Sequence, residues 1–565
     1  MPGRERGGRR AGGGRQTGGT AVTIAVVAAL ATLVLAVGIG TFLLVHVTGS
    51  PQETATTFLT DWQGRDYSDM HGVTVNAPEG GVAGPLKATA AELNLRSIHL
   101  TLGTVTQNGS SAQAKFTATA EIAGGQVWKY QGDLPMVISN RHWFVSWSPS
   151  VIYPALQTGE RFVLSAVWPA RGQVLAADGT VLSSPKAIGQ SGSIALVTGN
   201  VVRATAAQAK KLGPPYQAGD LIGLGGVEQA YEHQLAGHPA LTIRIEGPGD
   251  KIDATAATLP GKAGVSVRTS LVMRDQLAAS AAVRDATTTK PIDFVAIQPS
   301  TGRVLAVIDR PGGFDRAIQG VFPPGSTFKV VTASALTGTG LRPASTVQCP
   351  AQVNIGGRVF HNFDNEQLGT TSLQTAFAVS CNSTFITLAT QRLSGSTLAS
   401  EADTFGFNAQ PNLGIPATLG KFTTPHTPID LAADAFGQGT DLVNPLSEAA
   451  MAAAVENGTW RPPQFVLSPA PRQTAQPQTI SPTVLATLRP MMRAVVTVGT
   501  AAQVGFPAGV FGKTGTAEFG SAQNPKAHAW FVGYRGDLAF AVLVEGGGVG
   551  ADASAPIANA FLRNL

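Results

Sequence analysis

A run of 27 residues without Asp, Glu, Lys or Arg, from Ala21 to Val47, constrains the fold of this chain more than any other feature. As a helix it would be roughly 40 Å long, whereas the apolar core of a bilayer is about 30 Å thick. The apolar part of a cleaved signal peptide is shorter, about 7–15 residues, and no convincing small-residue cleavage site follows here. We therefore predict one uncleaved transmembrane anchor, over residues 20–47.

Arginine is concentrated before this apolar run. Residues 1–19 contain five arginines and one glutamate, a net charge of +4, so the rest of the chain carries +1 of the total of +5. Because positively charged flanks stay in the cytoplasm, we predict a cytoplasmic basic tail over residues 1–19 and an extracytoplasmic body from residue 48. A nearly neutral body also argues against a nucleic-acid-binding protein.

The body is long enough for several domains, since single cores stop growing at about 250–300 residues. From residue 52 a helical pattern is followed by strands with polar turns, which predicts a small α+β domain over 52–155. A mixed segment occupies 156–275. A further α/β unit, predicted over 286–565, opens with a strand–turn–strand pattern and continues through Ala-rich helices to closing strands.

The cysteines and histidines do not indicate a metal site. Cys349 and Cys381 leave two states open, one disulfide or two buried thiols. The nine histidines include no HExxH, and His233 and His238 are five residues apart, which does not place them on one helical face. We therefore expect neither a metal nor a cofactor.

The first motif with chemical meaning is Ser326-x-x-Lys329, within FPPGSTFKVVTASAL. Two prolines and a glycine break the chain, and Ser326 then opens an apolar segment that we predict to be helical. Residues i and i+3 of a helix share a face, so a lysine with a lowered pKa could take the proton of the serine hydroxyl. Alone, the pair is better explained by a helix-capping serine and a solvated lysine.

The second motif is Ser380-x-Asn382, within AFAVSCNSTFITLA. A loop before a helix would direct both side chains into one cleft, where Ser380 could pass a proton and Asn382 could bind an amide. An ordinary turn explains this pattern equally well when it is taken alone.

The third motif is Lys513-Thr514-Gly515-Thr516, within GVFGKTGTAEFG. On a strand it offers a cation and two hydroxyls to a carboxylate, and its glycine leaves room for a substrate backbone beside the strand. It is not a phosphate loop, because residue 507 is not the glycine that G-x-x-x-x-G-K-[ST] requires.

Together, in this order, the three motifs are the signature of penicillin-interacting serine enzymes. The chain resembles the class B penicillin-binding proteins, also in the strings FGQGTDLVNPLSEAAMAAAVENGTW, VVTVGTA and HAWFVGY that surround the motifs. One departure is Asn444–Pro445, where the family often has Thr–Pro. The resemblance implies a D,D-transpeptidase that cross-links peptidoglycan stem peptides and is inhibited by β-lactams.

This resemblance implies four catalytic residues. Ser326 would be acylated by the D-Ala-D-Ala end of a stem peptide, with Lys329 as its general base. Ser380 would relay the proton toward the leaving amine, and Lys513 would keep Lys329 electrostatically poised. The backbone N–H groups of Ser326 and Thr516 would form the oxyanion hole.

The resemblance also implies four substrate-binding residues. Asn382 would hold the amide of the donor peptide. Thr514 and Thr516 would bind the terminal carboxylate together with Lys513, and Gly515 between them is the fourth substrate-binding residue.

The same resemblance gives each predicted region an identity. Residues 52–155 are similar to the cone-shaped extra domain of the methicillin-resistance subgroup, 156–275 to a pedestal or dimerisation domain, and 286–565 to an α/β, serine β-lactamase-like transpeptidase domain. The implied setting is the cell membrane and the implied partners are proteins of a cell-wall synthesis complex, including a glycan polymerase.

Three alternatives share parts of this pattern. A β-lactamase or a D,D-carboxypeptidase would use the same acylation but hydrolyse the acyl-enzyme with water. A β-lactam-binding scaffold would bind without turnover. The predicted anchor and the long region before residue 286 favour the wall-synthesis enzyme, and an idle scaffold would be expected to have lost one of the three motifs.

Overall fold

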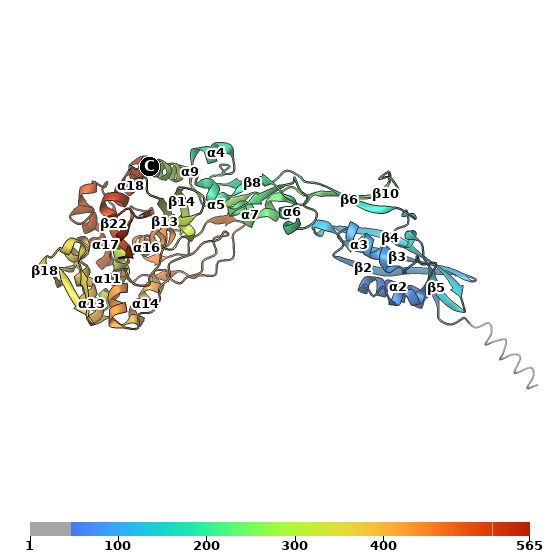
Figure 1. Cartoon of the computed structure of the whole chain (residues 1–565), viewed down its shortest axis with the longest axis horizontal. Coiled ribbons are helices and arrows are strands. Elements are labelled where there is room, and N and C mark those ends of the chain that lie inside the picture. The colour runs from blue at the N-terminus through green and yellow to red at the C-terminus, as the bar shows by residue number, and fades with distance from the viewer. Residues whose placement is uncertain (1–46, 522–523) are drawn as a thin grey trace, which may run out of the picture. The chain divides into compact units, whose positions relative to one another are not determined.

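The computed structural model describes residues 47–521 and 524–565, which form two compact units (Figure 1). One unit contains the chain up to Val167 together with Ala240–Pro260, and the other contains Trp168–Pro239 and Gly261–Leu565. The segment 156–275, predicted as one domain, therefore contributes to both units. The predicted tail and all but the last residue of the predicted anchor lie outside the described residues. Within the described ranges, no helix is long and apolar enough to span a bilayer.

The first unit is built on an antiparallel sheet with a short parallel edge, in the order β1-β5-β4-β3-β2. Strand β3 alternates buried and exposed residues along its length, as expected for a sheet with one face covered. Helix α2 (Pro51–Gly64) packs on this sheet through Trp62, whose ring lies 5.8 Å from that of Phe116. The strands are β1 (Thr74–Val75), β2 (Ser97–Asn108), β3 (Ser111–Glu121), β4 (Val127–Ser139) and β5 (His142–Ser146).

Helix α2 begins as its sequence dictates. Ser50 caps it in a capping box with Glu53, and Pro51 occupies the first turn, where its missing N–H has no cost. The helix continues to Gly64, and the apolar positions Ala55, Phe58, Leu59 and Trp62 on its inner face are all buried. The predicted helix followed by strands is confirmed in this unit. A second helix, α3 (Ala83–Glu92), and a 3-10 turn, η1 (Asp69–Val73), complete its periphery.

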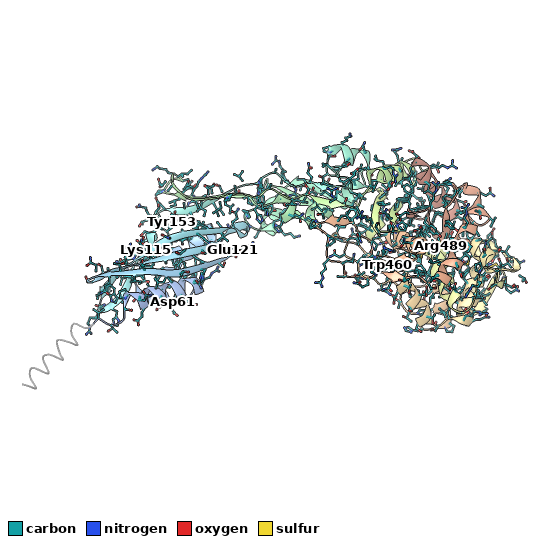
Figure 2. All side chains as sticks on the ribbon, turned by 180° about the vertical axis from the view of Figure 1, so that it is seen from behind. Asp61, Lys115, Glu121, Tyr153, Trp460 and Arg489 are labelled. Carbon is teal, nitrogen blue, oxygen red and sulfur yellow. A yellow bond between two sulfur atoms is a disulfide. The ribbon has the colours of Figure 1, made fainter. Side chains whose placement is uncertain are left out.

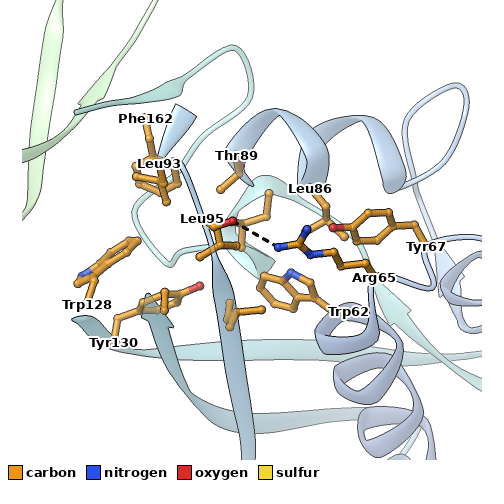
Figure 3. Close-up of a pocket in the computed structure, with 13 residues that line it drawn as sticks. Trp62, Arg65, Tyr67, Leu86, Thr89, Leu93, Leu95, Trp128, Tyr130 and Phe162 are labelled. Atoms are coloured by element: carbon orange, nitrogen blue, oxygen red, sulfur yellow. Dashed lines mark hydrogen bonds between the residues drawn. The ribbon is translucent and has the colours of Figure 1, made fainter. Parts of the chain in front are cut away.

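A small apolar cavity lies inside this unit (Figure 3). Trp62, Trp128 and Tyr130 line one part of it, and the Arg65 guanidinium reaches the Leu95 carbonyl at 3.3 Å. Because the two tryptophans are almost completely buried, the cavity belongs to the core of the unit.

Three further strands of the first unit come from two separate stretches of the sequence. β6 (Arg161–Val167), β10 (Ala240–Glu246) and β11 (Ile252–Leu259) form an antiparallel sheet in the order β11-β10-β6. The intervening residues 168–239 fold with the second unit. They contain β7 (Val174–Leu175), α4 (Pro185–Gln190), α5 (Ile194–Thr198), β8 (Asn200–Arg203), α6 (Ala206–Leu212), β9 (Leu221–Leu224), α7 (Gly226–Ala230) and α8 (Glu232–Ala236).

The second unit has a five-stranded antiparallel sheet at its centre, in the order β14-β13-β24-β23-β22. Every residue of β24 is buried, so helices cover both faces of the sheet. Helices α9 (Met273–Arg284) and α18 (Gly550–Asn564) pack on each other and on the sheet, and α16 (Pro445–Asn457) packs on β24 and β13. The strands are β13 (Ile292–Gln298), β14 (Arg303–Arg310), β22 (Phe511–Ser521), β23 (Asn524–Tyr534) and β24 (Ala539–Val544).

Helix α17 (Pro482–Thr497) packs against α16 and caps its C-terminal end. Its Arg489 donates to the carbonyls of Val455 and Glu456, two of the four that a helix C-terminus leaves without partners. Trp460 follows α16 and is 1% exposed (Figure 2 labels both Trp460 and Arg489). These contacts fix the C-terminal end of α16 in the second unit.

The rest of the helical part lies between β14 and α16 in the sequence. It consists of α10 (Arg316–Gln319), η4 (Gly325–Phe328), α11 (Lys329–Gly338), α12 (Leu373–Ala378), α13 (Asn382–Arg392), α14 (Gly395–Thr404) and α15 (Pro428–Asp434), with the small strands β15 (Thr346–Cys349), β16 (Gln352–Ile355), β17 (Arg358–His361) and β18 (Gly369–Ser372). The motif residues come from η4 and the start of α11, from the α12–α13 connection and the start of α13, and from β22, the edge strand of the central sheet.

Candidate active site

Ser326 lies in a tight 3-10 turn directly before α11. The predicted helix begins at this point, but its first turn is 3-10 rather than α. Gly325 has φ +56, and a Cβ there would lie 2.7 Å from the Thr516 carbonyl oxygen, so only glycine fits. Its N–H donates to the Gly437 carbonyl at 2.9 Å. The turn is thereby fixed against β22 on one side and the 435–441 loop on the other.

Ser380 and Asn382 lie where α12 ends and α13 begins. Ser380 has φ +66, a left-handed conformation that non-glycine residues rarely adopt and that concentrates at functional sites. Asn382 is the first residue of α13, and its side-chain amide donates to the His361 carbonyl at 3.0 Å. The predicted loop before a helix is therefore present.

Strand β22 presents the third motif at the open edge of the central sheet. The Thr516 carbonyl accepts a hydrogen bond from the Gln438 side chain at 3.2 Å and so points away from β23. Because the N–H and C=O of one strand residue point to the same side, the Thr516 N–H also faces the open edge, beside Gly325 and Ser326. This is the direction that an oxyanion donor requires.

Lys329 joins the first two motifs. Its Nζ lies 3.0 Å from Ser326 Oγ, 3.1 Å from Ser380 Oγ, 2.7 Å from the Ser380 carbonyl oxygen and 2.6 Å from Asn382 Oδ1. The carbonyl and the amide oxygen can only accept, so they take two N–H groups of the amine. A neutral amine then has its lone pair left for the Ser326 hydroxyl.

The surroundings of Lys329 favour the neutral form. Its side chain is fully buried, and burial, with the like charge of Lys513, holds the pKa of Lys329 well below its ordinary value. Its acceptors on Asn382 and Ser380 are neutral oxygens, so they add no negative charge that would favour the ammonium form. Ser326 thus has a base at hydrogen-bond distance.

Lys513 lies on the other side of the Ser380 hydroxyl. Its Nζ is 3.0 Å from Ser380 Oγ and 2.8 Å from the Thr514 carbonyl oxygen. Burial lowers the pKa of Lys513 to about 7. Thr514 is 5% exposed, whereas Thr516 is only partly buried. The two lysines and Ser380 form a continuous chain of proton-carrying groups that ends at Ser326.

All eight predicted site residues are brought together by the fold, and three neighbours add to them. Thr500 Oγ1 lies 2.7 Å from Thr514 Oγ1, Gln438 bonds to the Thr516 carbonyl, and Glu448 bonds to Thr327 beside the nucleophile. Thr500 lies in VVTVGTA, and Gln438 and Glu448 lie in the string that begins with FGQG. The resemblance had singled out both strings but had given no role to these residues.

The two cysteines form a disulfide between the end of β15 and the middle of the second motif. Cys381 stands between Ser380 and Asn382, so the bond ties this motif to a neighbouring strand. The alternative of two free thiols, left open by the sequence, is thereby excluded for this structure.

The departure at Asn444 does not disturb the site. Its side chain accepts from the Ser447 N–H at 2.9 Å and caps α16, as a threonine would, and donates to the Thr418 carbonyl at 3.0 Å. Across residues 47–521 and 524–565, no group of three or more His, Cys, Asp or Glu side chains is placed to hold a metal ion.

Comparison with known proteins agrees with this architecture. Residues 292–563 match the penicillin binding protein transpeptidase domain, and residues 50–160 match the NTF2-like N-terminal transpeptidase domain. The chain therefore carries both domains, and the resemblance to class B penicillin-binding proteins, including the extra domain, is confirmed. The first match begins at β13, the first strand of the central sheet in the chain, and ends in α18.

Curated relatives include the peptidoglycan D,D-transpeptidase PbpA of Mycolicibacterium smegmatis, 33% identical over 328 residues. The match covers 47% of this chain and 65% of that protein, slightly less than two thirds of its length. PbpA of Mycobacterium tuberculosis is 29% identical over 327 residues, which cover 48% of this chain and 66% of that protein.

Solved structures share the fold. Pseudomonas aeruginosa PBP2 in complex with WCK 5153 has a TM-score of 0.59 at 24% identity and covers 71% of this chain and 96% of its own. PBP2 in its complex with MreC from Helicobacter pylori has a TM-score of 0.60 at 17% identity. The match covers 72% of this chain and 98% of that PBP2 chain.

Proposed function

We propose that this protein is a peptidoglycan D,D-transpeptidase that cross-links stem peptides through an acyl-enzyme on Ser326. The observation that carries the proposal is the position of Lys329, whose Nζ is buried, 3.0 Å from Ser326 Oγ, and held by acceptors that leave its lone pair for the hydroxyl. The named relatives that share the transpeptidase domain support the same reaction.

The first half-reaction forms the acyl-enzyme. Ser326 Oγ attacks the carbonyl carbon of the penultimate D-Ala while its proton passes to Lys329 Nζ. The developing oxyanion is held by the N–H groups of Ser326 and Thr516. The Thr516 N–H faces the open edge of β22, against which the Gly325 turn packs. The peptide C–N bond then breaks, and the proton reaches the leaving amine through Ser380 Oγ, 3.1 Å from Lys329 Nζ.

Substrate is held by the remaining residues of the site. The terminal carboxylate lies against Thr514 and Thr516 and near the Lys513 ammonium, while Asn382 binds the donor amide. Gly515 has no room for a side chain, because a Cβ there would lie 2.9 Å from Thr327 and Trp530.

In the second half-reaction an amine of a neighbouring stem peptide attacks the ester carbonyl. Its proton returns through the same groups to Ser326 Oγ, which leaves as the free serine. A β-lactam mimics the D-Ala-D-Ala end, so its ring would open on Ser326 and leave a long-lived ester.

The test is intact-mass spectrometry of the full-length chain, extracted in detergent, with a penicillin. We expect the mass of one penicillin on the wild type, localised by peptide mapping to Ser326, and no adduct on Ser326→Ala. Rapid hydrolysis of the penicillin without an adduct would instead indicate a β-lactamase. Release of D-Ala from a stem peptide without transfer to a second amine would indicate a carboxypeptidase. Binding of the penicillin without a covalent adduct would indicate a scaffold.

We also propose that residues 20–47 anchor the protein in the cell membrane, with the tail in the cytoplasm and the catalytic unit outside. The long uncharged run and the preceding arginines support this placement. In this setting the protein would work in a cell-wall synthesis complex with a glycan polymerase, and its likeness to a PBP2 solved with MreC supports such partners. Deletion of residues 1–47 should move the protein from the membrane to the soluble fraction, and unchanged membrane recovery would contradict the anchor.

A further inference from the structure

Thr327, the residue after the nucleophile, has more hydrogen-bond neighbours than its one proton can serve. Its Oγ1 lies 2.9 Å from the Pro324 carbonyl oxygen and 2.9 Å from Glu448 Oε1. Thr327, Pro324 and Glu448 are all buried, away from bulk water. A carbonyl oxygen can only accept, and so can an ionised carboxylate. Two hydrogen bonds among these three oxygens therefore need a second proton.

Among the described residues, only the carboxyl of Glu448 can supply the second proton. Its Oε2 has no hydrogen-bond partner among the described residues, and its side chain is 1% exposed. An ionised carboxylate at such a position would be desolvated and would be compensated by one hydroxyl at most, which is costly. Burial accordingly raises the pKa of Glu448 to about 8.

Charged groups on the elements around α16 do not compensate Glu448, because they are engaged elsewhere. Arg316 of α10 pairs with Asp293 of β13, and Arg489 of α17 donates to main-chain carbonyls. His528 of β23 stacks on Phe519. Lys329, at the start of α11, bonds to the partners already described. Within the described part of the chain, Thr327 is the one side chain that forms a hydrogen bond with Glu448.

We propose that Glu448 is a protonated positioning residue, which donates to Thr327 and thereby directs the threonine proton to Pro324. That second bond closes the 3-10 turn that carries Ser326. The proposal rests on the proposed function, since its role is to hold Ser326 in the geometry needed for acylation.

Ionisation of Glu448 would reverse the pattern. A carboxylate is a stronger acceptor than a peptide carbonyl, so the Thr327 proton would turn to Glu448 and the bond to Pro324 would be lost. The Ser326 turn would then be held only by the hydrogen bond from the Gly325 N–H to the Gly437 carbonyl and by the other main-chain contacts of the turn. Glutamine at this position can still donate and cannot ionise, whereas methionine fills a similar volume and can do neither.

The experiment measures acylation of the full-length chain in detergent by a fluorescent penicillin, from pH 6 to 9.5, for wild type, E448Q and E448M. We expect E448Q to match wild type within about twofold at pH 7 and E448M to be ~10-fold slower, the effect of about one lost buried hydrogen bond. The E448Q-to-wild-type ratio should rise ~10-fold from pH 7 to pH 9, as expected for a group that ionises near pH 8. The lysines titrate in both proteins, so their contribution cancels in the ratio.

A matched control is Glu401→Met. Glu401 of α14 is a half-buried carboxyl that is likewise bonded to a hydroxyl, that of Ser334 on α11, but it lies away from the Ser326 turn. We expect E401M to acylate at the wild-type rate and with the wild-type pH profile. An E448M variant equal to E401M, or a constant E448Q-to-wild-type ratio, would overturn the proposal.

A second measurement does not depend on catalysis. Because the folded pKa of Glu448 is raised, the folded state keeps a proton that the unfolded state loses, and wild type loses stability as pH rises from about 4.5 to about 8. The Tm difference between E448Q and wild type should therefore grow over this range and then level off. A flat difference would show that Glu448 is not protonated in the fold, even if no penicillin adduct forms and the proposed function itself fails.

Discussion

Ser380 Oγ lies 3.0 Å from Lys513 Nζ, and the same oxygen lies 3.1 Å from Lys329 Nζ. One hydroxyl therefore separates two fully buried amines, and the charge of one acts on the titration of the other. The site works as proposed when Lys329 is neutral and Lys513 is charged.

The rate of acylation by a penicillin should therefore show a bell-shaped dependence on pH. The rate rises as Lys329 loses its proton, which happens well below its ordinary pKa because of burial and Lys513. It falls when Lys513 is deprotonated, with an alkaline limb near pH 7. Second-order rate constants measured from pH 5 to 9 check this, and a rate that rises continuously to pH 9 would show that Lys513 is not needed as a cation.

Lys513→Met tests the coupling between the amines. Without the neighbouring charge, the pKa of Lys329 should rise, because that charge is one of the two causes that lower it. The acid limb should move to higher pH and the alkaline limb of Lys513 should disappear, while the maximal rate falls by ~100-fold or more for loss of the carboxylate-binding cation. An acid limb at the wild-type pH would contradict the electrostatic link.

Asn382→Asp should impair the site more than its small change in shape suggests. Asn382 Oδ1 lies 2.6 Å from Lys329 Nζ, so a carboxylate there would pair with the ammonium form and raise the pKa of Lys329. At pH 7 we expect acylation to fall by ~10-fold or more, and the ratio of the variant rate to the wild-type rate should recover at higher pH. Asn382→Ala is the control, because it removes an acceptor without adding charge and should not move the acid limb upward. Equal pH profiles for the two variants would contradict the prediction.

The disulfide should support both stability and acylation. Cys349 and Cys381 are 32 residues apart, and closing a loop of this length stabilises a fold by about 3–4 kcal/mol in the chain-entropy account. The double variant C349S/C381S should unfold at lower temperature and acylate more slowly, because Ser380 and Asn382 flank Cys381. Wild type treated with dithiothreitol should reproduce both effects, whereas the double variant should not respond to it. Full activity of wild type with two labelled thiols would argue against the coupling.

Local spacing explains why the chemistry of the site could be predicted. Ser326 and Lys329 are one turn apart, and Ser380 and Asn382 are one residue apart, so each pair is adjacent whatever the rest of the fold does. The helix α2 followed by β2 to β5 was predictable for a similar reason, since apolar spacing within each element shows its buried face.

Other features depend on contacts that spacing does not encode. Gln438 and Glu448 reach the site from more than a hundred residues beyond Ser326, and no periodic pattern relates them to it. The spacing of the cysteines could not decide between a disulfide and free thiols. Strand β10 joins the first unit although the residues immediately before it fold with the second, because its partner β6 precedes that whole inserted segment in the chain.

Gly437 offers a final prediction, in which crowding rather than backbone conformation decides the outcome. Gly437 has φ +77, and a Cβ there would lie 2.0 Å from the Gly325 carbonyl oxygen, directly before the nucleophile. Gly340, just beyond the end of α11, has φ +94, but a Cβ added there would meet no atom of the described residues within 4 Å, so it is the matched control. Gly340→Ala should cost only the left-handed strain, about 1–2 kcal/mol of unfolding free energy, and leave acylation unchanged. Gly437→Ala has the same strain and must also displace Gly325, and a shift of about 1 Å at the nucleophile can slow a reaction ~100-fold. Equal acylation rates for the two alanine variants, measured with a fluorescent penicillin, would show that the Ser326 turn does not depend on the 435–441 loop.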